Sequence, residues 1–327
     1  MARTKRRPGI MGWALIVVAL IAAALVGTWF WATSRDAVGL LDGIDSLFTR
    51  GDAELAAGPV AYGDHPQQHL FAWRPAGRDD GTPLPVLVFF HGGGWHSGRP
   101  EDYAFVARNF APEGFVVVVA GYRLNEAGRY PAMLEDSAAA VRWTRDHAAE
   151  LGGDPARIYL MGHSAGAYNA VMLALDPQWL ERVGLERAGL PDGAIAGAIG
   201  LAGPYDFYPF DKDSSRNAFG HVATPAQTQP VTFARAGAPP LLLLTGDEDT
   251  IVRPRNTRAL VQAQAAAGDP AQSDVFAGMD HKDIVMALAR PFDRDARVKR
   301  AVLGFLRAQE EAYAARRSSL AVQPANR

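Results

Sequence analysis

Short apolar runs separated by helical patterns constrain the fold of this 327-residue chain most strongly. The runs lie at Val86–Phe90, Phe115–Ala120, Ile158–Met161, Ala194–Leu201, Leu241–Thr245 and Asp274–Phe276. Because most of them are apolar at consecutive positions, they are typical of strands that are covered on both faces. Their alternation with helices predicts an α/β fold with a mostly parallel central sheet flanked by helices.

Two helices and two further strands can be placed around these runs. Residues 131–151 carry apolar side chains on one face and end at a glycine pair, which indicates a helix. A second helix is predicted over about Asp295–Arg307. Val60–Gly63 and Leu70–Arg74 are candidates for short antiparallel strands that precede the main sheet.

The composition narrows the class of function. The chain is 48% hydrophobic and 21% charged, as expected of a globular protein with a large core. Its formal net charge of −2 gives no sign of a nucleic-acid partner. The absence of cysteine excludes disulfides, thiol nucleophiles and cysteine-ligated metals. Neither a cofactor nor a metal is expected from the motifs.

The N-terminus predicts a membrane anchor. A basic cluster lies in residues 1–9, and residues 10–32 are almost wholly apolar and end in aromatic side chains. A helix of about 22 residues spans roughly 33 Å, which matches a hydrocarbon core of about 30 Å. The positive cluster should stay cytoplasmic, so the domain that follows the anchor is expected on the extracytoplasmic side, periplasmic or extracellular.

Two alternatives to a retained anchor remain open. One is a cleaved signal peptide, although the apolar core of such peptides is usually only about 7–15 residues long. The other is a buried core helix, which rarely lacks a polar face over this length. Residues 33–58 are then a linker or cap segment, residues 59–311 the α/β domain, and residues 312–327 a polar, frayed tail.

Residues 162–166, of sequence GHSAG, fit the G-x-S-x-G pattern. They follow a predicted strand and precede an Ala-rich helical stretch, which is the context of a nucleophile elbow. The serine of such an elbow lies in a strained turn, so its neighbours must be small. Ser164 is therefore the candidate nucleophile. The alternative is a glycine-rich turn that carries an idle serine.

Residues 91–95, of sequence HGGGW, directly follow the predicted strand Val86–Phe90. Glycines allow backbone N–H groups to point at an oxygen that becomes negative during acyl transfer. We expect the amides of Gly93, Gly94 and Ala165 to form an oxyanion hole. A phosphate loop would need a following Lys-Ser/Thr, and a metal site at His91 would need a partner ligand at a suitable spacing. His91 is instead interpreted as a residue that holds the loop.

The remaining catalytic partners should follow the serine, in the order acid and then histidine. Asp249, with Asp247 in reserve, lies at the carboxyl end of the predicted strand Leu241–Thr245, in a cluster that could also be a solvated acidic loop. His281 follows the last short strand, whereas His221 precedes the acid and breaks the order. The alternative for His281 is an ordinary surface histidine.

Together these motifs resemble the esterase/lipase branch of the α/β-hydrolase superfamily. The similarity is closest to hormone-sensitive-lipase-like and feruloyl-esterase-like carboxylesterases, and kynurenine formamidases are also similar. It covers roughly residues 58–308, and its motifs are Tyr62-Gly63, HGGGW at 91–95, Tyr122-Arg123-Leu124, Asp136, Gly153-Asp154-Pro155, GHSAG at 162–166 and G-x-x-D-x-x-V at 246–252. The last motif favours Asp249 over Asp247. The resemblance implies structural roles for Tyr122, Arg123 and Asp136.

Three functions are compatible with these residues. The first is a carboxylesterase that acts on small to medium esters, the second an amide hydrolase of the arylformamidase type, and the third a non-catalytic, membrane-tethered binding protein. The expected partners are an ester substrate and the membrane, with no nucleic acid. Four aromatic residues could line a substrate pocket or belong to the core: Trp95, Tyr168, Phe207 and Tyr208. The segment Asp206–Ala238 could form part of a cap.

Overall fold

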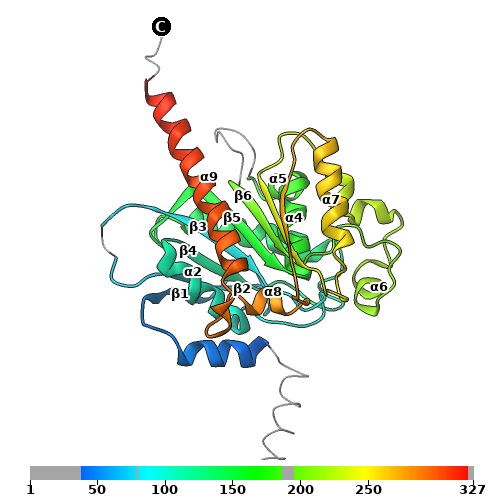
Figure 1. The fold of residues 1–327 in the computed structure, drawn as a ribbon, viewed down its shortest axis with the longest axis horizontal. Coiled ribbons are helices and arrows are strands. Elements are labelled where there is room, and N and C mark those ends of the chain that lie inside the picture. The colour runs from blue at the N-terminus through cyan, green and yellow to red at the C-terminus, as the bar shows by residue number, and fades with distance from the viewer. Residues whose placement is uncertain (1–37, 79, 186–194, 323–327) are drawn as a thin grey trace, which may run out of the picture.

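The computed structural model describes residues 38–78, 80–185 and 195–322. Its centre is a sheet of eight strands in the order β1-β2-β4-β3-β5-β6-β7-β8 (Figure 1). The strands are β1 (Ala53–Ala61), β2 (His69–Pro75), β3 (Leu84–Phe90), β4 (Val116–Ala120), β5 (Gly153–His163), β6 (Gly197–Leu201), β7 (Leu241–Gly246) and β8 (Gln272–Phe276). At one end of the sheet, β1 pairs antiparallel with β2 and β2 pairs antiparallel with β4. All other neighbouring strands pair in parallel.

Helices cover both faces of the sheet, as the apolar runs predict. One face packs against α3 (Ala132–His147), α4 (Ala165–Leu175), α5 (Gln178–Arg182) and α7 (Arg255–Ala266). The other packs against α2 (Ala104–Phe110), α8 (Asp283–Met286) and α9 (Arg297–Val322). In Figure 1, α9 crosses the near face of the sheet.

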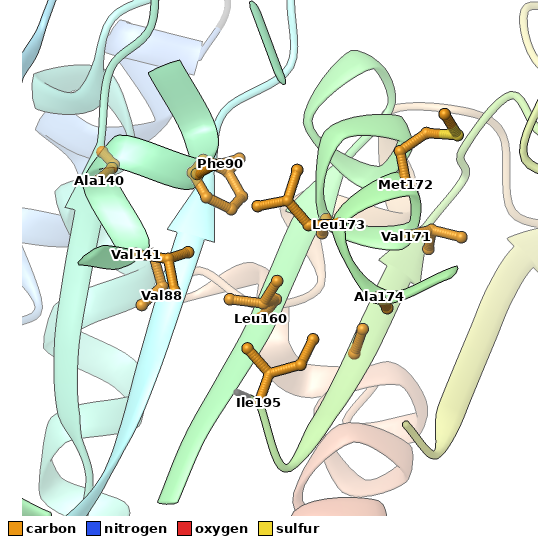
Figure 2. Packing of buried hydrophobic residues seen from close by; sticks show 14 of the residues in the cluster. Val88, Phe90, Ala140, Val141, Leu160, Val171, Met172, Leu173, Ala174 and Ile195 are labelled. Carbon is orange, nitrogen blue, oxygen red and sulfur yellow. The ribbon is translucent and has the colours of Figure 1, made fainter. Parts of the chain in front are cut away.

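Successive residues of the central strands point to opposite faces. Val86 and Val88 of β3 pack in the layer of α3 and α4, whereas Leu87 and Phe89 pack in the layer of α2 and α9. Figure 2 shows the first layer, in which Val88, Leu160 of β5 and Val141 of α3 lie together. Both sets of side chains are fully buried, which explains why these strands read as continuous apolar runs.

Two predicted domain boundaries differ from those in the structure. Strand β1 begins at Ala53, so the α/β domain begins before residue 59, and the predicted linker or cap at 33–58 is wrong in its second part. The predicted frayed tail is also wrong as far as Val322, because α9 continues through residues 312–322. The remaining predicted strands and helices are present, with ends that differ by a few residues.

The helix over residues 38–47 is docked against the domain near α2 (Figure 1). Arg108 donates from Nε to Oδ2 of Asp45 over 2.8 Å and from Nη2 to Oδ1 of Asp42 over 2.7 Å. Asn109 and the backbone amide of Arg290 donate to Oδ1 of Asp45, each over 2.8 Å. Because Asp45 is only 1% exposed, loss of these donors would leave a buried carboxylate without partners, which is strongly destabilising.

The predicted anchor at residues 10–32 lies outside the described residues. Of the helices that the structure describes, none is both long and apolar enough to cross a membrane.

Candidate active site

Ser164 lies in the turn between β5 and α4. Its backbone has φ 54° and ψ −116°, a strained conformation for a residue other than glycine. Its amide donates to the carbonyl oxygen of Leu201 on the neighbouring strand β6, over 2.8 Å. A Cβ atom at Gly162 would overlap the carbonyl of Gly166, so the elbow needs small residues at these positions. The strand, turn and helix predicted from GHSAG are therefore present.

A continuous chain of hydrogen bonds joins the three predicted catalytic side chains. Nε2 of His281 lies 2.9 Å from Oγ of Ser164, and Nδ1 of His281 lies 2.7 Å from Oδ2 of Asp249. The other carboxylate oxygen of Asp249 accepts from the amides of Ile251 and Val252, over 2.8 and 2.7 Å. Asp249 and His281 are 3% and 7% exposed, so water competes little for these contacts.

The structure also separates the alternatives for the acid and the base. Oδ1 of Asp247 accepts from the amide of Gly278 and does not contact His281. The ring of His221 lies against the carbonyl oxygen of Tyr130, away from Ser164. Asp249 and His281, and not these two residues, are brought to the serine.

The loop at residues 91–95 lies beside the elbow. Its backbone takes positive φ at Gly93 (121°), Gly94 (59°) and Trp95 (61°). A Cβ atom at Gly93 would overlap the carbonyl of Ser97, so only glycine fits there. Gly93, Gly94 and Ala165 line the same cavity as Ser164. Within the described part of the chain, their amides donate no hydrogen bond, which leaves them available to an oxyanion.

His91 holds this loop in place. Its ring stacks on Tyr122 at 4.4 Å between centroids, and the hydroxyl of Tyr122 donates to the carbonyl of His91 over 2.8 Å. Burial lowers the pKa of His91 to about 4, so the ring is neutral near pH 7. No group of three potential metal ligands occurs among the residues that the structure describes.

Arg123 and Asp136, to which the resemblance also assigned structural roles, form a second polar cluster. Asp136 is 1% exposed and accepts from the amide, Nε and Nη2 of Arg123 and from Nε2 of Gln68. These bonds tie α3 to the segment that follows β4 and to the residue that precedes β2, so their role is structural.

His163 is a residue of the site that the sequence analysis did not single out. Its Nε2 lies 3.0 Å from the backbone carbonyl oxygen of His281, and its ring centroid lies 4.9 Å from that of His281. Burial, and secondarily the charge of His281, lowers the pKa of His163 to about 3. A neutral ring must carry its proton on Nε2 to donate to that carbonyl, so His163 fixes the backbone that carries the catalytic imidazole.

Replacing His163 with leucine is therefore expected to lower kcat by roughly 10- to 100-fold, the size of effect seen when a supporting hydrogen bond misplaces a reacting group. KM should change less than kcat, because the other residues that line the cavity are unchanged. A glutamine at this position can present an N–H near the site of Nε2 and should restore much of kcat. Steady-state kinetics of H163L and H163Q check this, and equal kcat for H163L and the wild type would contradict it.

The site opens into a cavity of about 530 Å³. Of the four aromatic residues considered from the sequence, Trp95 and Phe207 line it. Tyr168 is fully buried in the aromatic cluster behind Trp95, with their rings edge to face at 5.4 Å. Tyr208 is 54% exposed and contacts Phe210. The segment 207–215 forms one wall of the cavity, and Val38 of the docked helix also reaches it.

This fold and elbow define the class of protein. A mostly parallel sheet with a strand-serine-helix turn, followed by the acid after β7 and the histidine after β8, is the α/β-hydrolase arrangement. The BD-FAE family model matches residues 75–263, which is more than half of the chain. The chain belongs to this family, and with it to the esterase/lipase branch of the α/β hydrolases, as the sequence motifs predicted.

Known proteins are similar over parts of the chain. Carboxylesterase NlhH of Mycobacterium tuberculosis is 46% identical over 103 residues, which are 31% of each chain. Esterase LipC of the same organism is 29% identical over 225 residues, which are 62% of this chain and 53% of LipC. The chain thus spans about a third to a half of the length of these curated relatives.

Solved structures agree on the fold. Esterase B from Lactobacillus Rhamnosis superposes with a TM-score of 0.72 at 18% identity, over 92% of this chain and 98% of that one. Propionate-bound Est2, a thermophilic esterase of Thermogutta terrifontis, superposes with a TM-score of 0.59 at 26% identity, over 78% and 92%.

Proposed function

We propose that this protein is a serine hydrolase that cleaves small to medium carboxylic esters through an acyl-enzyme. The observation that carries the proposal is the unbroken chain of hydrogen bonds from Asp249 through His281 to Ser164. That chain faces a cavity whose glycine loop offers uncommitted amides. The printed names of the relatives, carboxylesterase and esterase, support the same reaction.

The geometry assigns a role to each residue of the site. Nε2 of His281 takes the proton from Oγ of Ser164 as that oxygen bonds to the ester carbonyl carbon. The carbonyl oxygen becomes negative and accepts from the amides of Gly93, Gly94 and Ala165, and the N-terminal end of α4 adds a favourable dipole. His281 then gives its proton to the leaving alcohol. Water repeats the cycle on the acyl-enzyme and releases the acid.

A substrate panel tests this proposal on the full chain. Nitrophenyl esters with acyl chains of two to eight carbons are compared with N-formyl aryl amides of similar size. Ester turnover that exceeds amide turnover supports an esterase, and the reverse order would support the arylformamidase alternative. Failure to turn over either class, in a protein shown to be folded, would contradict the hydrolase and leave the binding protein.

We further propose that residues 10–32 tether the enzyme to a membrane, with the catalytic domain on the extracytoplasmic side. The support is the apolar length and the flanking positive charge in the sequence. Val38, which lines the cavity, follows residue 32 by only six residues, a chain length of about 20 Å when extended. The cavity would therefore lie close to the bilayer surface.

Fractionation of expressing cells tests the tether. The protein should sediment with membranes, resist extraction by carbonate and dissolve in detergent. In intact spheroplasts or cells, an external protease should reach an epitope placed after Val322. Recovery of the protein in the soluble fraction, or protection of that epitope, would contradict the proposed tether or its orientation.

A further inference from the structure

Four basic side chains surround the cavity that holds Ser164. Lys212 comes from the segment between β6 and α6 (Asp213–Phe219), Arg253 and Arg255 from the loop and helix start after β7, and Lys282 from the position after His281. All four are exposed, so their charges face solvent at the cavity rim. Three separate parts of the chain thus bring positive charge to one opening.

Within the cavity lining these charges outnumber the carboxylates, although Arg253 and Arg255 also line a neighbouring hollow with Asp247 and Asp249. Asp211 is the single carboxylate among the described residues that line the cavity. Arg255 lies 3.9 Å from Asp206, at the edge of ion-pair distance. The side chains of Lys212, Arg253 and Lys282 form no hydrogen bond or ion pair with the described residues. The whole chain carries a formal charge of −2, so the positive rim is a local feature.

The same walls also carry apolar groups beside these charges. Phe207 precedes Lys212 in one wall, and Ile251 and Val252 precede Arg253 in another, all lining the same space. An amphipathic molecule fits this arrangement, with its apolar part beside the triad and a charge at the opening. A concave rim of one sign also concentrates ligands of the opposite sign, within a Debye length of about 8–10 Å.

We infer that the ester substrate carries a negatively charged group, a carboxylate or a phosphate, which the rim of Lys212, Arg253, Arg255 and Lys282 binds while the ester lies at Ser164. The inference rests on the proposed hydrolase function and names its substrate class. The anion can belong to a soluble acid or to the headgroup of a lipid, since both present the same chemistry to the rim.

Three matched pairs of esters test this on the full-length protein. meta-Carboxyphenyl butyrate against meta-carbamoylphenyl butyrate places the charge on the alcohol, and phenyl hydrogen adipate against phenyl hexanoate places it on the acyl chain. Monomeric dihexanoyl phosphatidic acid against dihexanoylglycerol, which lacks the phosphate, represents the lipid source. The measurement is the ratio of kcat/KM for the anionic ester to kcat/KM for the neutral ester.

The triple variant K212Q, R253Q and K282Q should lower that ratio by on the order of 10-fold in at least one pair, because three exposed contacts of modest strength are lost. Its kcat/KM on the neutral esters is measured in parallel, so that any general loss of activity cancels in the ratio. The control R300Q removes an exposed charge from α9, away from the cavity, and should leave the ratio unchanged. High salt should reduce the wild-type ratio.

The ester pair whose kcat/KM ratio falls in the triple variant identifies the source of the anion. A response only in the phospholipid pair assigns the rim to a lipid headgroup, and a response in the aryl or adipate pair assigns it to a soluble acid. An unchanged ratio in every pair, with hydrolysis of the neutral esters intact, overturns the anion inference and leaves the hydrolase standing. Absence of hydrolysis in all six esters overturns both.

Discussion

Replacing Ser164 with alanine is expected to lower kcat on the best ester substrate by about 10⁶-fold, since removal of a triad nucleophile costs about this much in serine hydrolases. The alanine leaves His281 and the oxyanion amides in place but removes the oxygen that bonds to the carbonyl carbon. A residual rate of about 10³-fold over water should remain from the oxyanion hole and binding. Single-turnover and steady-state kinetics on a nitrophenyl ester measure the loss relative to the wild type and the residual rate over water.

A fluorophosphonate probe gives an independent readout of the same residue. It should label the wild-type protein covalently and fail to label S164A. The control S318A changes an exposed serine on α9 and should label as the wild type does. Circular dichroism of each variant shows that the fold is kept. Labelling of S164A, or no labelling of a folded wild type, would contradict the assignment of Ser164 as nucleophile.

The central strands could be predicted because their sequences carry a strong signal. Val86–Phe90 is apolar at each position, since both faces of β3 are covered by helices. Only the end of strand β1 was predicted, within Val60–Gly63. The residues before Val60 are mostly small or polar and at most partly buried, and their pairing with β2 defines them as a strand. An edge strand of this kind depends on its partner more than on its own residues.

The end of α9 shows a different limit. Residues 312–322 lack a continuous apolar face, so their sequence predicted a frayed tail. In the structure, Glu310 accepts from Nη1 of Arg157 over 2.7 Å and from the hydroxyl of Tyr159 over 2.7 Å. The guanidinium of Arg157 also lies over the ring of Tyr313. These contacts hold the helix to the side of β5, and they join residues about 150 positions apart, which local periodicity does not detect.

The candidate site also contains some residues that the sequence predicted and others that it did not. Its elbow and glycine loop could be predicted because their conformations demand glycine at fixed spacings, and chain order then placed the acid and the histidine. His163 was passed over as the variable position of G-x-S-x-G, because its importance lies in a bond to the carbonyl of His281, 118 residues away. The docking of Asp42 and Asp45 on Arg108, and the basic rim, likewise depend on tertiary proximity alone.

Replacing Asp249 with asparagine is expected to lower kcat by about 10⁴-fold while leaving the fold intact, the size of effect known for this change in another serine hydrolase. The reason is that the two oxygens of the Asp249 carboxylate have different partners. One oxygen accepts from the amides of Ile251 and Val252, and the other faces Nδ1 of His281. Asparagine has one acceptor oxygen, which the two loop amides will take.

The NH₂ group of the introduced asparagine must then point at Nδ1 of His281 and donate to it. The imidazole is driven to the tautomer that carries its proton on Nε2, which is the atom that should receive the proton of Ser164. The matched control D247N changes a carboxylate that contacts Gly278 and not the imidazole, and its kcat should equal that of the wild type. A D249N protein that keeps more than a tenth of the wild-type kcat would show that Asp249 does not set the tautomer of His281.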